Sequence, residues 1–241
     1  MSGHSKWSQI KRQKGAKDVK RSGIFSKLAK AITIAARSGP DPKDNFKLRL
    51  AVQKAREANM PNDNVERAIK RASNAENGTI IEEVMYEGYG PGGSAFMISA
   101  LTDNKNRTVA EIRHMVGEYG GNLGNSGSVN WQFAPKGVHR ISNEALTAID
   151  RSALELDAID AGADDVREET EGLTILTDPK HAEQLTTFLR ERNITTASAG
   201  IEYVPTTTVH LDDASHAKLM QMIEQLEEHD DVDAIFTNAD V

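Results

Sequence analysis

The chain has 241 residues, no cysteine and a formal net charge of −7, and hydrophobic residues make up 38% of it. This composition is typical of a soluble globular protein, and the lack of cysteine excludes disulfide bonds, thiolate catalysis and cysteine-ligated zinc. No apolar run approaches the roughly 20 residues of a membrane span, and the chain does not start with the apolar core of a secretory signal. We therefore expect a cytoplasmic protein with no membrane contact.

The first stretch, residues 3–21, is strongly basic. It contains seven Lys and Arg residues but only one acid, Asp18, and Trp7 interrupts the charged run. Residues 1–75 hold 18 Lys and Arg against 6 Asp and Glu, a net charge of +12, whereas residues 76–241 hold 11 against 30, a net charge of −19. This asymmetry indicates a nucleic acid or an anionic membrane as the partner of the basic end, and the nucleic acid is favoured. A solvated tail is the alternative interpretation of residues 3–21, and Trp7 suits stacking on a base or packing on the helices that follow.

Three amphipathic helices are predicted after this stretch, because apolar residues recur there at helical spacing. The first covers residues 21–37, the second runs through Leu48, and the third runs through Val65. Asp41 is the predicted N-cap of the second helix and Pro42 its first residue. Short helices of this kind bury their apolar faces only against one another, so we expect a small bundle. On the first helix, the side opposite the apolar face carries Lys20, Lys27, Lys30 and Arg37.

From about residue 80 the apolar period becomes strand-like. Short strands alternate with helices, a pattern that predicts α+β sandwiches with helices on one face of each sheet. The expected strands are 82–90, 93–103, 128–133, 137–142, 172–178, 194–204, 206–212 and 232–238, and the expected helices are 107–119, 145–162, 181–193 and 214–229.

No motif in the acidic part indicates catalysis. Residues 88–93 match the GxGxxG dinucleotide pattern, but a strand follows and Pro91 lacks a backbone donor, so a hairpin turn is preferred. The glycines between residues 121 and 127 indicate a helix end and a loop with positive φ angles, with a phosphate-binding nest as the alternative. The histidines are scattered. The acids at 164–171 lack the spacing of a calcium loop, so they are interpreted as a solvated face, and the same interpretation applies to Asp230, Asp231 and Asp233. We predict no catalytic residue, no metal ligand and no cofactor.

Several longer motifs resemble the YebC family. The resemblance implies an α+β fold with an N-terminal three-helix domain, residues 1–77, and two further α+β domains, one inserted in the other. The outer domain would comprise residues 78–134 and 206–241 and the inserted domain residues 135–205, so that 206–212 and 232–238 complete the sheet begun near residue 80. The motifs are GHSKW at 3–7, DPKDN at 41–45, NMP at 59–61, YEGYGPGG at 86–93, DNKNRTVAEIRH at 103–114 and GGNLGNSGSV at 120–129.

The family is described as cytoplasmic DNA-binding transcriptional regulators, and some relatives act in translation, including a mitochondrial activator. We therefore predict a nucleic-acid-binding regulator of gene expression, a DNA-binding transcriptional regulator and not an enzyme, that contacts phosphates through its basic N-terminal third. One alternative is a ribosome-associated translation factor whose arm binds ribosomal or transfer RNA, and another is a scaffold or enzyme acting through the acidic domains. The oligomeric state is not predicted. The predicted nucleic-acid-binding residues are His4, Lys6, Trp7, Lys11, Arg12, Lys14, Lys17, Lys20, Arg21, Lys27, Lys30, Arg37, Arg67 and Arg71.

Overall fold

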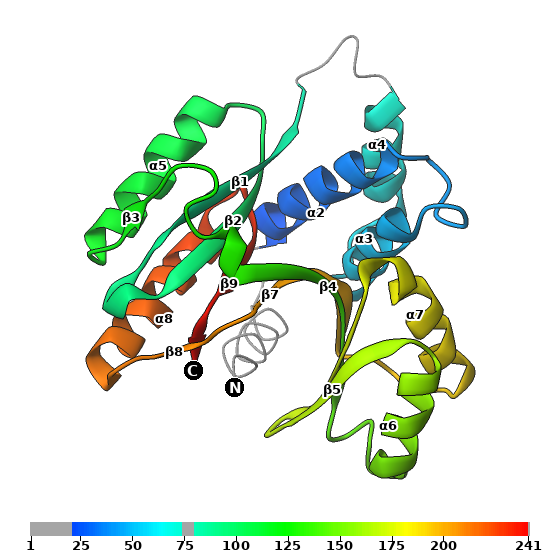
Figure 1. The fold of residues 1–241 in the computed structure, drawn as a ribbon. Coiled ribbons are helices and arrows are strands. Elements are labelled where there is room, and N and C mark those ends of the chain that lie inside the picture. Colours follow the sequence, from blue (N-terminus) through cyan, green and yellow to red (C-terminus); the bar gives the residue numbers. More distant parts are fainter. Residues whose placement is uncertain (1–20, 74–79, 241) are drawn as a thin grey trace. The chain divides into compact units, whose positions relative to one another are not determined.

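The computed structural model describes residues 21–73 and 80–240, which separate into two compact units (Figure 1). Of the described residues, the first unit contains 21–73, 80–131 and 211–237, and the second contains 132–210 and 238–240. None of the helices in these ranges is long and apolar enough to cross a membrane.

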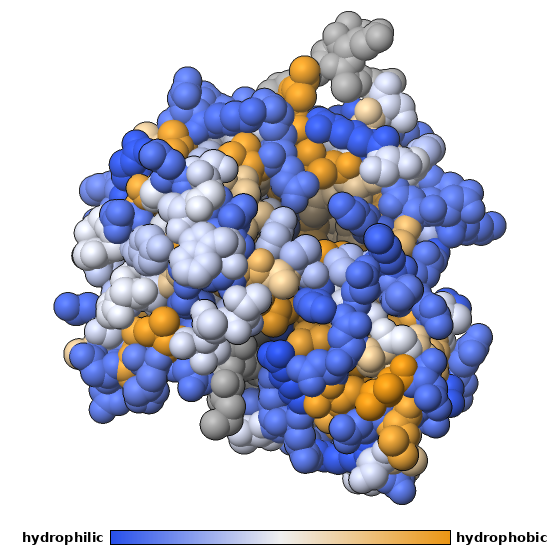
Figure 2. All heavy atoms as spheres, viewed as in Figure 1, coloured by the Kyte–Doolittle hydropathy of each residue, from blue (hydrophilic) through white to orange (hydrophobic). Residues whose placement is uncertain are grey.

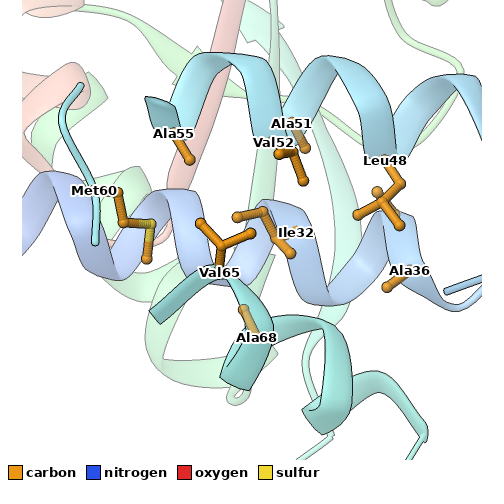
Figure 3. Close-up of a cluster of buried hydrophobic side chains, with 10 residues drawn as sticks. Ile32, Ala36, Leu48, Ala51, Val52, Ala55, Met60, Val65 and Ala68 are labelled. Carbon is orange, nitrogen blue, oxygen red and sulfur yellow. The ribbon is translucent and has the colours of Figure 1, made fainter. Parts of the chain in front are cut away.

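The first unit begins with the predicted three-helix bundle. Its helices are α2 (Arg21–Ala36), α3 (Phe46–Glu57) and α4 (Asn62–Ser73). Figure 3 shows α3 and α4 on either side of α2, with their apolar side chains directed at Ile32 in the middle. Small residues let the helices approach closely around this branched side chain, and Ile32 and Leu48 are completely buried. The bundle core consists of Ile32, Ala35, Ala36, Leu48, Ala51, Val52, Ala55, Met60, Val65 and Ala68.

Helix α3 begins later than predicted. Its N-cap is Asn45, whose side chain accepts a hydrogen bond from the N–H of Leu48 at 3.0 Å and donates one to the carbonyl of Ala35 at 2.7 Å. The assignment of Asp41 as the cap and Pro42 as the first helical residue is wrong, because residues 42–44 form a turn. Asn45 is the better cap because its amide has both a donor and an acceptor and can satisfy backbone groups of both helices, whereas an aspartate only accepts.

The rest of the first unit is a four-stranded antiparallel sheet with two helices. The strand order is β3-β1-β2-β9, and the last strand comes from the far end of the sequence. As predicted, the GxGxxG motif is the turn of a hairpin, and Gly92 adopts a φ of +67° there. The elements are β1 (Glu82–Tyr89), β2 (Ala95–Thr102), α5 (Lys105–Glu118), β3 (Asn122–Leu123), α8 (Asp213–Glu228) and β9 (Val232–Thr237).

Two strand predictions are wrong in this part of the chain. Residues 128–133 were expected to form a strand, but Asn130–Gln132 is a 3₁₀ turn and only Phe133 begins a strand. Residues 206–212 do not join the four-stranded sheet either. Only β8 (Val209–His210) forms there, and it pairs in parallel with β10 (Ala239–Asp240) in the second unit.

The second unit is built on another four-stranded antiparallel sheet, in the order β5-β6-β4-β7. Because this sheet is formed entirely between residues 133 and 205, it is inserted between β3 and β9 of the first unit. The fold is therefore α+β with one sheet domain inserted in the other, while the exact boundaries at 77, 134 and 205 stay predictions. The elements are β4 (Phe133–Ser142), α6 (Arg151–Asp160), β5 (Ala163–Glu169), β6 (Gly172–Thr177), α7 (Ala182–Glu191) and β7 (Ser198–Pro205).

Sequence patterns misjudged two elements of the second unit. Strand β5 is not predicted by the sequence, because four of its seven residues are acidic. The expected solvated face is confirmed for Asp164, Asp165 and Glu168, which are exposed on this edge strand. Helix α6 starts at Arg151 rather than at 145, since the carboxylate of Asp150 accepts hydrogen bonds from the N–H groups of Ser152 and Ala153.

Candidate nucleic-acid interface

Most of the predicted interface lies before the described residues. Arg21 is the first residue of α2, where the structure gives the backbone only. The predictions for these residues therefore stay open. Outside the described residues are His4, Lys6, Trp7, Lys11, Arg12, Lys14, Lys17 and Lys20.

Two of the predicted residues, Lys27 and Lys30 on α2, contact the far end of the sequence. The Lys27 ammonium group donates a hydrogen bond to the backbone carbonyl of Glu227, at 2.5 Å. The Lys30 ammonium group lies 2.5 Å from a carboxylate oxygen of Asp231 and 3.1 Å from the carbonyl of Asp230. These acceptors belong to the C-terminal end of α8 and the turn before β9, so the charged side of α2 faces protein.

Asp231 is the centre of a polar cluster in which Lys30 is one of three donors. It is only 3% exposed, and its second carboxylate oxygen accepts hydrogen bonds from Thr108 at 2.7 Å and Arg107 at 3.0 Å. Burial alone would raise the pKa of Asp231, but the hydrogen bonds from Lys30, Thr108 and Arg107 outweigh it and hold the pKa well below its ordinary value. Asp231 is therefore ionised near neutral pH, and its interpretation as part of a solvated face is wrong because its side chain is buried. Both Arg107 and Thr108 come from the DNKNRT motif.

The remaining predicted residues are exposed. Arg37 follows the end of α2, and Arg67 and Arg71 lie on α4. The Arg67 guanidinium donates to the carbonyl of Asp63, at 3.2 Å, and to the side chain of Asn64, so its own helix orients it. The structure leaves all three on the surface, and it separates them from Lys27 and Lys30, whose charges face α8.

Helices α3 and α4 also carry bases that the sequence-based list omitted. Lys47 and Lys54 on α3 are seven residues apart and hence about two helical turns apart on one side, and Lys70 lies between Arg67 and Arg71 on one side of α4. Their spacing outside the apolar stripe was the available signal. Within residues 21–73 and 80–240, no carboxylate pairs with Lys47, Lys54, Lys70 or Arg71. The visible surface of the bundle is largely hydrophilic (Figure 2). We call Lys47, Lys54, Arg67, Lys70 and Arg71 the outer cations.

The glycine-rich loop after α5 is an anion site that the protein fills itself. The carboxylate of Glu87 on β1 accepts hydrogen bonds from the N–H groups of Gly127, Val129 and Asn130 at 2.8–2.9 Å. Burial favours a higher pKa for Glu87, but the three backbone donors outweigh it and lower the pKa. The loop is thus an anion-binding nest, the alternative interpretation of its glycines, but it binds a carboxylate side chain in place of a phosphate. These hydrogen bonds also explain why the strand expected at 128–133 is missing. The N–H groups of Val129 and Asn130 donate to Glu87 instead of to a neighbouring strand.

The second unit has a buried polar pair of a different kind. His139 on β4 is completely buried, and its Nε2 lies 2.7 Å from the hydroxyl of Thr186 on α7. Burial lowers the pKa of His139 to about 4, so the ring is neutral near pH 7. Among the described residues, no group of three His, Asp or Glu side chains is placed to hold a metal ion.

Comparison with known proteins gives one consistent result. Residues 5–75 match the TACO1/YebC protein N-terminal domain, and residues 81–239 match the TACO1/YebC second and third domain. The whole chain is 48% identical to a protein of Halothermothrix orenii and 46% identical to one of Treponema pallidum, covering 96% and 98% of them, and both are named "Probable transcriptional regulatory protein". A crystal structure of a conserved hypothetical protein from Aquifex aeolicus matches with a TM-score of 0.84 and 39% identity, over 92% of this chain and 91% of that one.

Proposed function

Because the chain belongs to the TACO1/YebC family, whose relatives are named as transcriptional regulators, we propose that it is a cytoplasmic regulator of gene expression that binds nucleic acid, and DNA first of all. In this proposal, the basic N-terminal third contacts the phosphates. The observation that carries it is the set of outer cations, which are exposed on two helices and, apart from Arg67, have no partner among the described residues.

Exposed, unpaired bases are suited to phosphate binding for a simple reason. Each phosphate neutralised by Lys or Arg releases condensed counterions, which supplies most of the free energy of non-specific binding. A lysine that already holds a carboxylate must first break that contact, whereas Lys47 and Lys54 have none to break within residues 21–73 and 80–240. If about five phosphates are contacted, the logarithm of the binding constant falls with the logarithm of salt concentration with a slope of about −4 to −5.

A second candidate function follows from the distribution of charge. Residues 76–241 carry a net charge of −19, so nucleic acid lying along both ends of the molecule would be repelled by one of them. A partner made of both RNA and protein avoids this repulsion, because its protein surfaces can meet the acidic part. The second candidate is therefore a translation factor that binds the ribosome through the same cations.

The test compares both partners at the same salt concentration. The chain is titrated against duplex genomic DNA fragments and against ribosomes, together with the variant K47E/K54E/K70E and a control, K180E/K218E, which reverses exposed lysines outside the bundle. Nanomolar, sequence-selective DNA binding that only the first variant loses supports the transcriptional regulator. Ribosome binding lost in that variant, with DNA binding no better than micromolar, supports the translation factor. If the variant binds both partners like the unchanged chain, the proposed interface is wrong.

A further inference from the structure

Lys27 donates to a backbone carbonyl, and Lys30 donates to a backbone carbonyl and to a carboxylate, so both ammonium groups are held by oxygen acceptors as they would be by phosphates. We propose that the C-terminal end of α8 together with Asp231 is an intramolecular latch that holds these two lysines in place of nucleic-acid phosphates. Docking of α2 on α8 and phosphate binding by Lys27 and Lys30 then exclude each other. This inference rests on the proposed function and adds a competitor inside the chain.

The acceptor side of the latch is built for cations. The last carbonyl groups of a helix have no partner within the helix and carry its negative dipole end, where a lysine is favourable. Lys27 takes the carbonyl of Glu227 near the end of α8, and Lys30 takes the carbonyl of Asp230 and the carboxylate of Asp231. Two lysines one helical turn apart on α2 therefore meet a group of oxygens from the end of α8 and the turn that follows it.

Asp231 has two other side-chain donors besides Lys30. Thr108 and Arg107 hold one carboxylate oxygen and Lys30 holds the other, so removing Lys30 breaks only one side of the cluster. The N–H of Asp231 in addition donates to the ring of His229, at 3.1 Å. Lys30 is hence the exchangeable partner, and the acceptor remains ready for it.

Docking also has an unfavourable component at Lys27. Burial lowers the pKa of Lys27, and the nearby acids Asp230, Glu227 and Asp233 only partly offset that effect. Lys27 thus pays a desolvation cost while it is docked. The apolar face of α2 is buried in the bundle core, so it is the charged side that meets α8. Contacts of this kind weaken as phosphates compete for the same ammonium groups.

The sequence offers a direct way to lock the latch. The chain has no cysteine, and a Cβ atom added at Gly23 would lie 3.4 Å from a carboxylate oxygen of Asp230. The variant G23C/D230C can therefore be oxidised to fix α2 on α8 or reduced to release it. Each single-cysteine variant, treated with the same oxidant, is the control.

The experiment measures binding of duplex DNA and of ribosomes by the oxidised and the reduced variant over a range of salt concentrations. We expect at least fivefold weaker binding in the oxidised form, and a log–log salt slope smaller in size by about 2, because two phosphate contacts are lost. Equal binding by both forms overturns the latch and leaves the proposed function intact. No binding by either form overturns the proposed function and the latch together.

A second variant tests the latch without a cross-link. Asp231→Asn keeps an acceptor for Thr108 but removes the charge that holds Lys30. We expect at least threefold tighter nucleic-acid binding in this variant, and loss of that gain when Lys27 and Lys30 are also replaced by methionine. A gain that survives in the triple variant assigns the effect of Asp231 to overall charge and contradicts the latch.

Discussion

Helix α2 and its neighbours α3 and α4 carry the same kinds of base and use them in opposite ways. Lys27 and Lys30 on α2 hold the end of α8, whereas Lys47, Lys54 and Lys70 on the flanking helices have no carboxylate partner within the described residues. All of them lie outside the apolar stripe of their helix. A charged helix side therefore does not reveal whether it faces solvent or an acidic surface. For the central helix of the bundle, the deciding partner lies about 200 residues away in the sequence.

The largest expected effect is on nucleic-acid binding and concerns the lysines that face solvent. Replacing Lys47, Lys54 and Lys70 by glutamate should weaken nucleic-acid binding roughly a hundredfold at moderate salt, because three phosphate contacts are lost and three repulsions added. The melting temperature should change by less than about 2 °C, since these side chains are exposed. Binding titrations and thermal unfolding check both statements. The control K180E/K218E should bind nearly normally, and an equal loss in that control would point to net charge rather than to the bundle.

The next largest effect is on stability and concerns Lys30 on α2, which faces protein. Replacing Lys30 by methionine leaves the buried Asp231 with Arg107 and Thr108 only, and it should lower the free energy of unfolding by about 2 kcal/mol. Replacing the exposed Lys54 in the same way should change the free energy by no more than about 0.5 kcal/mol. Urea unfolding of both variants measures the difference. Equal effects would mean that the two classes of lysine do not differ as their contacts indicate.

Glu87 provides a reference carboxylate that is held by backbone N–H groups and, in the part of the chain that the structure describes, by no lysine. Replacing it by glutamine removes the negative charge and one of the two acceptor oxygens that three backbone N–H groups use. The free energy of unfolding should fall by about 1–2 kcal/mol. The variant should bind nucleic acid like the unchanged chain, because the carboxylate accepts its hydrogen bonds from the loop at 127–130, which contains none of the outer cations. Thermal unfolding and a DNA titration test this. A marked change in nucleic-acid affinity would show that the loop takes part in binding.

The smallest expected effect is on the pH dependence of the free energy of unfolding. Because the pKa of Asp231 is lower in the folded chain than in the unfolded one, its ionised form stabilises the fold above the unfolded value of about 3.9. That stabilisation is lost progressively as the pH falls below about 4. Urea unfolding at pH 6, 4 and 3 should show that Asp231→Asn loses less free energy of unfolding on acidification than the unchanged chain does. Lys54→Met should lose as much as the unchanged chain. Parallel pH profiles for all three chains would contradict the assignment.

Hydrophobic periodicity predicted the helices and strands whose formation depends on residues close in the sequence. The three bundle helices, the 82–103 hairpin and the helix at the end of the chain all follow from apolar spacing and turn residues, and the family resemblance supplied the inserted domain. The errors arise where a side chain meets a distant backbone. Asn45 rather than Asp41 caps α3 because it also bonds the end of α2. Residues 128–132 are not a strand because Glu87 accepts the N–H groups of Val129 and Asn130.

The site was predictable to a similar degree. The sequence located positive charge in the first third and placed Arg37, Arg67 and Arg71 on the surface, where the structure has them. It could not show that Lys27 and Lys30 are held by Asp231 and the end of α8, since no local pattern links residues this far apart. The acidic strand β5 was missed for a related reason. Its stability comes from pairing with β6 rather than from its own alternation of apolar and polar residues.

The late position of β9 in the sequence sets the order in which the protein can be completed during synthesis. Strand β2 is buried along its whole length and pairs with β9, yet 129 residues separate Thr102 from Val232. At the usual rates of polypeptide synthesis, this interval lasts on the order of ten seconds, during which the nascent chain displays an apolar strand with an open edge. Asp231 emerges equally late. The bases of α2 are therefore made about 200 residues before Asp231, and they meet their acceptors only after that long interval.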